Sequence, residues 1–419
     1  MSDYTHWKVE RDDHGIAWLH IDMADSSANL LSGSVLEELR SILDALSKDL
    51  PQGIIFVSDK KSGFIFGADI KEFLDLNDVS NSQPFLDRGH ELMYKIENMV
   101  CPTVSIIKGM CLGGGTELSL ACNYIVAADD SKTRIGLPEI KLGIFPGYGG
   151  TARSIERCGP LPAMDLMLTG RAIPSRTAKK IGLIDEMVPD RQLKRAAVRY
   201  VMDAPKRKGP GFVQKLLNSS LLRPVIASQM RKQVARKARP EHYPAPYAFI
   251  DLWQKYAGNR KRMLREEAIA VAKLATGDTA HNLVRVYFLQ EALKNQGKQV
   301  DFKPAHVHVI GGGIMGGDIA SWCAIQGYSV TLQDQDPERV AGAFKRAQTS
   351  FKKKYKRDRR AIVAANDRLM PDHKGLGVSK ADIIIEAIFE DAEVKRSLYQ
   401  SIEPRMKPDA ILATNTSSI

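Results

Sequence analysis

Two glutamates in one glycine-rich stretch have the residue type and setting for proton-transfer chemistry. Residues 111–139 run CLGGGTELSLACNYIVAADDSKTRIGLPE, so three glycines precede Glu117 and a proline precedes Glu139. Glycines at the start of a helix leave backbone N–H groups open to a ligand, and the helix dipole favours negative charge there. A carboxylate at such a place is either a helix cap or a proton-transfer group that faces the ligand. These residues alone leave both interpretations open for each glutamate.

The segments around this stretch predict the elements that would position the two glutamates. Residues 103–107 (TVSII) are a β-branched run, which predicts a buried strand leading into the glycines. A second glycine-rich loop, residues 143–150 (GIFPGYGG), follows the second glutamate. An earlier loop, residues 63–70 (GFIFGADI), carries Ala68 and Asp69. These neighbours favour a ligand-facing role over a simple cap.

This order of strand, small-residue loop, glycine-opened helix and second carboxylate resembles the crotonase (enoyl-CoA hydratase/isomerase) family over about residues 10–190. The resemblance implies that two backbone N–H groups hold a thioester oxyanion and that the two glutamates exchange protons with water and with the acyl chain. The residues assigned in this way are, for catalysis, Ala68, Gly114, Glu117 and Glu139, and, for substrate binding, Asp69 and Gly147.

The domain organisation follows from a change in the pattern near residue 190. Before it, short strands and helices alternate, which predicts an α/β layered fold. From there to about residue 299, strand signals disappear and long helical patterns flank a proline-rich segment, RPEHYPAPYAF. We expect this stretch to pack as helices on its neighbours. The predicted domains are residues 1–190, a crotonase-like ββα spiral; 191–303, a helical extension and linker; and 304–419, a nucleotide-binding domain.

A phosphate-binding motif opens the third domain. Residues 307–316 (VHVIGGGIMG) contain G-x-G-x-x-G directly between an expected strand and an expected helix. Gly311, Gly313 and Gly316 would permit the tight turn and the close approach of a pyrophosphate. The next expected strand (SVTL) ends just before Asp334, whose carboxylate would accept hydrogen bonds from the adenosine ribose. Because no basic residue immediately follows Asp334, the motif favours NAD over NADP and predicts a Rossmann-type domain.

The second half also resembles L-3-hydroxyacyl-CoA dehydrogenases, in the segments VIGGGIMGGDIA, VTLQDQD, IIIEAIFEDAEVK and ATNTSSI. Together with the first half and the YPAP segment, the whole chain resembles the α subunit of fatty-acid β-oxidation complexes, in which the two enzymes are fused. The resemblance implies further NAD contacts from Glu390, Lys395 and Asn415, and a substrate contact from Ser417. Asp318 departs from the family pattern by placing a carboxylate in the first turn of the phosphate-binding helix. Because family members continue beyond ATNTSSI to their catalytic histidine, we expect a truncated chain with an incomplete dehydrogenase half.

The composition is typical of a globular protein with reduced cysteines. The chain has 419 residues, of which 44% are hydrophobic and 26% charged, and this length is enough for two or three domains. Its five cysteines form no C-x-x-C pair and show no metal-ligand spacing, so no metal site is predicted. The N-terminus has neither the apolar core of a signal peptide nor the acid-poor composition of a transit peptide, so a cytoplasmic location of bacterial type is expected.

The net charge of +11 is concentrated in three basic runs, KRK, RKQVARKAR and KKKYKRDRR. Such runs are compatible with solvated helix faces, with attraction of polyanionic CoA esters, or with contact to a membrane. Nucleic-acid binding is not predicted, because the runs lack interleaved aromatic residues and no helix-turn-helix pattern is present.

The predicted function is hydration of 2-enoyl-CoA thioesters in fatty-acid β-oxidation, with CoA as part of the substrate and NAD as the cofactor of the second half. Hydration needs one group to deprotonate water and one to protonate C2, and the presence of both glutamates favours it. Isomerisation of 3-enoyl to 2-enoyl esters needs only one carboxylate and stays an alternative, as does a crotonase-type hydrolase. A third alternative is an assembly subunit that mainly docks a thiolase β subunit in a hetero-oligomer.

Overall fold

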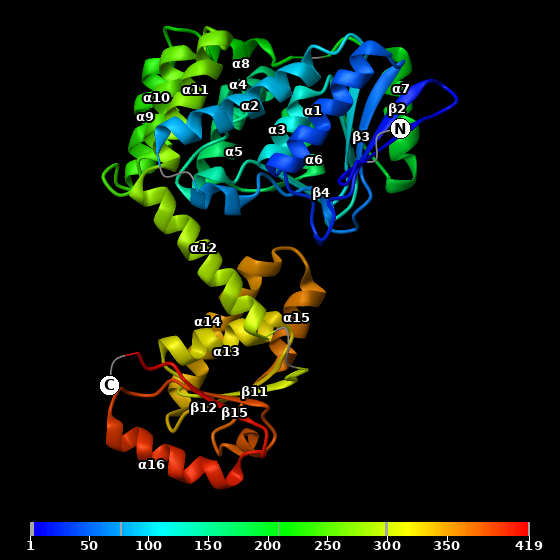
Figure 1. Cartoon of the computed structure of the whole chain (residues 1–419). Helices are drawn as coiled ribbons and strands as arrows, with labels where there is room; N and C mark the ends of the chain where they lie inside the picture. The colour runs from blue at the N-terminus through cyan, green and yellow to red at the C-terminus, as the bar shows by residue number, and fades with distance from the viewer. Residues whose placement is uncertain (1–3, 76–77, 208, 298–300, 418–419) are drawn as a thin grey trace. The chain divides into compact units, whose positions relative to one another are not determined.

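Figure 1 shows the computed structural model of the chain, which describes residues 4–75, 78–207, 209–297 and 301–417. The chain divides into two units, Met1–Lys294 and Asn295–Ile419. Both units combine parallel strands with helices, so the α/β fold class expected from the sequence is confirmed.

The first unit is built on two sheets. The larger sheet has the order β1-β2-β3-β5-β7-β10, in which β1 and β2 are antiparallel and all later neighbours are parallel. Its strands are Trp7–Arg11, Ile16–Ile21, Gly53–Ser58, Thr103–Ile107, Tyr124–Ala128 and Glu186–Val188. The smaller sheet has the order β4-β6-β8-β9, with strands Gly63–Ile65, Met110–Leu112, Arg134–Gly136 and Ile173–Pro174.

The chain winds between these sheets as a spiral. It leaves β3, β5 and β7 of the larger sheet and each time enters the next strand of the smaller sheet, β4, β6 and β8. Because β4, β6 and β8 pair side by side, the segments that follow them are brought together although they are far apart in sequence. This repeated passage is the ββα spiral expected from the sequence.

Helices cover both faces of the larger sheet. α7 (Leu193–Asp203) packs on one face through Leu193, Ala197 and Val201, and Figure 1 shows it across the sheet from α1 (Gly33–Lys48). The other helices before α7 are η1 (Ile70–Asp75), α2 (Val79–Glu97), α3 (Gly114–Ala121), η2 (Glu139–Leu142), α4 (Gly150–Cys158), α5 (Pro160–Thr169), α6 (Ser175–Ile181) and η3 (Asp190–Gln192).

α2 begins earlier than its sequence pattern indicates. The apolar periodicity starts only at Phe85, but the helix already begins at Val79 and contains Pro84. A proline inside a helix lacks the N–H for one intrahelical bond. Contacts of α2 with α1, α3 and α11 offset this loss, which a pattern confined to one segment does not report.

The strand-poor stretch after residue 190 folds into helices, most of which contribute residues to the core of the first unit. They are α8 (Phe212–Leu217), α9 (Arg223–Ala235), α10 (Ala245–Tyr256), α11 (Arg260–Ala275) and α12 (Asp278–Gln296). Trp253 and Val271 are buried in the same cluster as Phe56 of the larger sheet. The rings of Phe145 and Phe249 lie 5.5 Å apart. The helical stretch is therefore part of the unit that holds the two glutamates.

The second unit is a five-stranded parallel sheet in the order β13-β12-β11-β14-β15. The strands are β11 (His306–Ile310), β12 (Ser329–Gln333), β13 (Leu369–Pro371), β14 (Ile383–Glu386) and β15 (Ile411–Thr414). Its helices are α13 (Ile314–Gln326), α14 (Pro337–Tyr355), α15 (Arg359–Arg368), η5 (Leu376–Ser379), α16 (Ala392–Ile402) and η6 (Glu403–Arg405). This order confirms the expected Rossmann-type arrangement. Across the described part of both units, no helix is long and apolar enough to cross a membrane.

Candidate active site

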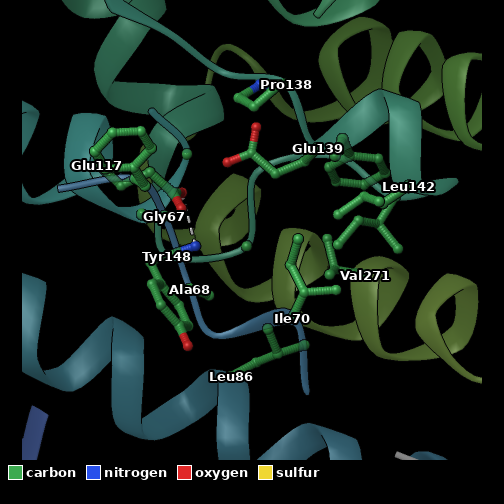
Figure 2. A pocket seen from close by; sticks show the side chains of 16 residues that line it. Gly67, Ala68, Ile70, Leu86, Glu117, Pro138, Glu139, Leu142, Tyr148 and Val271 are labelled. Carbon is green, nitrogen blue, oxygen red and sulfur yellow. Dashed lines mark hydrogen bonds between the residues drawn. The ribbon is translucent and has the colours of Figure 1, made fainter. Parts of the chain in front are cut away.

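A cavity of about 90 Å³ lies in the first unit, where loops of the spiral meet helices α2 and α11. Figure 2 shows the carboxylates of Glu117 and Glu139 toward one end of it and Ile70, Leu86 and Val271 toward the other. The lining residues are Phe66, Gly67, Ala68, Ile70, Leu86, Gly113, Gly114, Glu117, Pro138, Glu139, Leu142, Ile144, Phe145, Gly147, Tyr148 and Val271. A largely apolar wall with two carboxylates at one end suits a ligand that is apolar except at its reacting group.

The backbone N–H groups of Ala68 and Gly114 lie on neighbouring segments of this cavity. Leu31 and Ala68 form an isolated parallel bridge. Its two hydrogen bonds use the N–H groups of residues 31 and 69, at 2.8 and 3.4 Å, and leave that of Ala68 unused. Gly114 is the first residue of α3, so its N–H has no acceptor inside the helix. A Cβ atom at residue 114 would lie 3.5 Å from the Ala68 nitrogen. The fold thus brings together the two donors predicted for an oxyanion.

Glu117 is buried and accepts hydrogen bonds from the loop that precedes α4. Its Oε1 atom accepts from the backbone N–H groups of Tyr148 and Gly150, both at 2.8 Å. Burial and the negative charge of Glu267 raise the pKa of Glu117 to about 7, and the two backbone hydrogen bonds oppose that rise. Near neutral pH this carboxyl is therefore poised between its two protonation states.

The carboxyl oxygens of Glu139 are also buried, but they differ from those of Glu117 in their hydrogen bonding. It is the first residue of η2, behind Pro138, and among the described residues neither of its carboxylate oxygens has a hydrogen-bond partner. Burial and the negative charge of Glu117 raise the pKa of Glu139 well above its usual value. Burial beside Glu117 therefore favours the protonated form of Glu139, while the two backbone hydrogen bonds of Glu117 favour its ionised form. Two carboxyls whose surroundings push their proton affinities apart are suited to act as acid and base.

Glycines are required where these carboxyls approach the backbone. Gly113, the N-cap of α3, has φ +51°, and a Cβ atom there would lie 3.0 Å from Oε1 of Glu139. A Cβ atom on Gly150 would lie 2.8 Å from Oε1 of Glu117. Gly147 lines the cavity, and a Cβ atom on it would come within 2.9 Å of Leu86. The glycine-rich segments noted in the sequence thus admit the carboxyls and keep the cavity open.

Asp69, predicted to bind substrate, lies beside the cavity rather than in its lining. Its Oδ1 atom accepts a hydrogen bond from the backbone N–H of Lys71 at 3.0 Å. Its neighbours Ala68 and Ile70 both line the cavity. The carboxylate of Asp69 is thus engaged with its own loop.

Several residues of the site were not identified from the sequence. Tyr148, Leu86 and Val271 line the cavity, and Glu267 and His90 lie behind the loop that holds Glu117. Tyr148 stands inside the second glycine-rich loop, which could have drawn attention to it. Glu267 interrupts an otherwise apolar stripe on α11, formed by Met263, Leu264, Ala268, Val271, Ala272 and Ala275. A carboxylate within such a stripe is a signal of a buried polar contact.

The glycine motif of the second unit has the geometry of a dinucleotide cradle. Gly311 has φ +114°, and a Cβ atom on Gly316 would lie 1.9 Å from the Gly311 oxygen. A Cβ atom on Gly313 would meet nothing within 4 Å, which leaves space in front of the α13 N-terminus. Asp334 accepts a hydrogen bond from the Gly312 N–H at 2.6 Å. The residues present therefore fit a pyrophosphate at the glycines and a ribose near Asp334.

The other residues predicted around this cradle have mixed surroundings. Lys395 is buried and its ammonium lies 2.5 Å from Glu386, so its charge is used within the unit. The backbone N–H of Asn415 donates to the Glu386 carbonyl at 2.8 Å, while its side chain is exposed. Glu390 and Ser417 are also exposed. In the part of the chain that the structure describes, no group of His, Cys, Asp and Glu side chains could hold a metal ion. The placement of Asp318 in the first turn of the phosphate-binding helix was wrong, because α13 already begins at Ile314 and has no acidic residue in its first turn. Asp318 is its fifth residue and lies 4.0 Å from the Arg346 guanidinium.

Comparisons with known proteins match both units. Residues 13–242 match the enoyl-CoA hydratase/isomerase family, and residues 306–419 match the NAD-binding domain of 3-hydroxyacyl-CoA dehydrogenases. The fatty acid oxidation complex subunit alpha of Aliivibrio fischeri is 35% identical over 100% of this chain, and that of Shewanella baltica is 34% identical over 99%. The chain spans 62% and 60% of the length of these two relatives. An enoyl-CoA hydratase structure from Rhodobacter sphaeroides is similar over 68% of this chain and 90% of its own, with a TM-score of 0.55 and 17% identity, which shows a shared fold.

Each matched segment contains one of the two sites described above. Ala68, Glu117 and Glu139 all fall within residues 13–242, and the glycine cradle falls within residues 306–419. The spiral fold is the one expected from the resemblance in the first half. The chain therefore belongs to the enoyl-CoA hydratase/isomerase family, and its second unit is an NAD-binding domain of the 3-hydroxyacyl-CoA dehydrogenase type.

Proposed function

We propose that the first unit hydrates trans-2-enoyl-CoA thioesters to 3-hydroxyacyl-CoA thioesters, a step of fatty-acid β-oxidation. The observation that carries this proposal is the difference in hydrogen bonding between the two carboxyls. Glu117 accepts two backbone hydrogen bonds, which favour its ionised form, whereas Glu139 accepts none from the described residues, and its burial beside Glu117 favours its protonated form. Both line one cavity together with Ala68 and Gly114.

In this mechanism Glu117 removes a proton from water, and the resulting hydroxide adds to C3 of the enoyl thioester. The double-bond electrons move toward the thioester, and Glu139 delivers its proton to C2. The N–H groups of Ala68 and Gly114 stabilise the negative charge that develops on the thioester oxygen, and one such donor contributes about 3 kcal/mol. Return of the proton from Glu117 to Glu139 restores the starting state.

The test is the loss of enoyl-thioester absorbance when the purified chain is mixed with crotonyl-CoA, with 3-hydroxybutyryl-CoA identified as the product. A 3-enoyl-CoA is assayed in parallel, because isomerisation to the 2-enoyl ester is the alternative activity. Faster turnover of the 3-enoyl ester would favour the isomerase. Absence of turnover on short and long enoyl-CoAs would contradict the proposal.

We also propose that the second unit binds NAD through Gly311, Gly313, Gly316 and Asp334, with Glu390, Lys395 and Asn415 nearby. When bound, NAD would supply the hydride acceptor for oxidising a 3-hydroxyacyl-CoA, which Ser417 would contact. We expect this chain to bind NADH without reducing NAD. His306 and His308 are engaged with Thr331 inside the sheet, so we assign neither of them as the proton acceptor. NADH binding is measured by its fluorescence. Formation of NADH from NAD and 3-hydroxybutyryl-CoA would contradict the second expectation.

The whole-chain relatives support two broader proposals. Their names describe a complex, and we propose a thiolase β subunit as a partner of this chain. Phe212, Leu221 and Val225, on and near α8 and α9, expose most of their apolar surface, which suits a docking face. Co-purification with a thiolase tests this partner. The division into residues 1–190, 191–303 and 304–419 and a cytoplasmic location stay predictions of the sequence.

A further inference from the structure

A second buried carboxylate shares the N-terminus of α4 with Glu117. Glu267, on α11, is fully buried. Its Oε1 atom accepts a hydrogen bond from the Gly149 N–H at 2.6 Å, and its Oε2 atom accepts from the N–H of Thr151 at 3.3 Å and from the Thr151 hydroxyl. The residue is separated from the catalytic motifs by more than a hundred positions, so only packing of α11 brings it here.

The two glutamates accept hydrogen bonds from alternate N–H groups of one short segment, residues 148–151, at the N-terminus of α4. The N–H groups of residues 148 and 150 donate to Glu117, and those of residues 149 and 151 donate to Glu267. Free N–H groups at a helix N-terminus stabilise negative charge. Here the N–H groups at the α4 N-terminus donate to Glu117, which lines the cavity, and to Glu267, which does not. A change in the position of Glu267 therefore acts on Glu117 through the four adjacent peptide groups, and a change in its charge acts through electrostatics.

His90, on α2, connects Glu267 to the surface. Its Nε2 atom lies 3.3 Å from Oε1 of Glu267, and 13% of its side chain is exposed. It lines an open cleft of about 640 Å³, together with Asp87 and Tyr94. Burial lowers the pKa of His90, but the adjacent Glu267 carboxylate more than offsets this, so the pKa is raised above its usual value.

The charged groups around Glu117 come from four elements. Glu139 of η2 and Glu267 of α11 are acidic, while His90 of α2 and Arg153 of α4 are basic. Arg153 donates to the Tyr148 carbonyl at 2.9 Å and pairs with Glu97, so its charge is balanced locally. Neither His90 nor Glu267 lines the cavity, and the two contact each other.

We propose that Glu267 and His90 are positioning residues for Glu117: Glu267 holds residues 148–151 from the side away from the cavity, His90 contacts Glu267, and their charges set how readily Glu117 takes the proton of the attacking water. This inference rests on the proposed hydratase function. The Glu267 charge favours proton uptake by Glu117, and a protonated His90 offsets it. A structural cap alone would need the oxygens of Glu267 but not its charge.

The test compares Glu267→Gln and His90→Gln in the full chain, with Glu266→Gln as the matched control that removes one charge from the neighbouring, partly exposed position of α11. The pH dependence of kcat on crotonyl-CoA is measured for each. Glu267→Gln should move the acid limb to lower pH, and His90→Gln should move it to higher pH, each on the order of one pH unit. Glu266→Gln should leave the limb where it is in the unchanged chain.

A second readout separates this inference from the proposed function. Infrared difference spectra against Glu117→Gln report protonation of the Glu117 carboxyl directly, whether or not the chain turns over crotonyl-CoA. Opposite shifts of this titration in the two variants support the inference even if hydration is absent. Titrations that stay unmoved, or that move in the same direction, overturn it. If Glu267→Gln fails to fold, the shift in His90→Gln, whose side chain is partly exposed, still decides the matter.

Discussion

Replacing Glu139 with glutamine should slow the proposed chemistry by orders of magnitude without harming the fold or the binding of CoA esters. The structure gives the reason: burial and the negative charge of Glu117 raise the pKa of the carboxyl well above its usual value, and among the described residues its oxygens accept no hydrogen bond. An amide of nearly the same shape therefore removes no partner from the protein. What it removes is the proton that C2 must receive.

The magnitude follows from the role of a general acid, which contributes about 10²–10⁴-fold to a rate. This corresponds to about 3–5 kcal/mol of transition-state stabilisation. The kcat for crotonyl-CoA hydration should fall by that factor in Glu139→Gln. The Kd for butyryl-CoA, a saturated ester that cannot be hydrated, should change by less than about threefold, which is under 1 kcal/mol.

The assay pairs the rate of absorbance loss at saturating crotonyl-CoA with a calorimetric titration of butyryl-CoA on the same protein. Glu139→Asp serves as the conservative variant, because it keeps an acidic proton but moves it, and it should retain more activity than the amide. Unchanged kcat with weakened binding in Glu139→Gln would refute the acid role. Equal loss in the aspartate and glutamine variants would point to a steric requirement instead.

Further predictions concern pH, two glycine loops and the second unit. Because the base must be ionised and the pKa of Glu117 is raised to about 7, kcat should fall about tenfold per unit as pH decreases below about 7, which a pH–rate profile measures. Gly150→Ala should lower kcat about 10–100-fold, because its Cβ atom would lie 2.8 Å from Oε1 of Glu117. Gly209→Ala is the control and should leave kcat unchanged, because a Cβ atom there would meet nothing within 4 Å. Gly313→Val should weaken NADH binding by about tenfold or more while the melting temperature holds, because the added side chain occupies the space open to a pyrophosphate. Burial lowers the pKa of His308 below its usual 6.5, so the unfolded state binds protons first, and the second unit should melt at lower temperature as pH falls below about 6.5.

Much of the fold was predictable because its signals are local. The β-branched run at residues 103–107 became β5, and the glycines before Glu117 became the start of α3. The motif at Gly311 lies between β11 and α13, as its flanking pattern predicts. The start of α2 was not predictable in the same way, because packing against other helices carries the helix across Pro84.

The candidate site was likewise predictable only in part. Ala68, Gly114, Glu117 and Glu139 were identified from motifs, and the spiral brings all four to one cavity. The chemistry of the two carboxyls was not predictable, since both are glutamates in glycine-rich surroundings. Their difference arises from which backbone N–H groups reach them, and that depends on how the loop before α4 folds over Glu117.

The sequence by itself determined the positions where the backbone needs glycine, the strands that lead into them, and the residue types able to move protons or hold a dinucleotide. These properties depend on a few neighbouring residues, so a linear pattern carries them. Only the tertiary structure decided that α11 supplies Val271 to the cavity wall and Glu267 to the α4 N-terminus. The reason is physical: proton affinity depends on burial and on charges that approach through space, and these come from segments that packing, not chain order, makes neighbours.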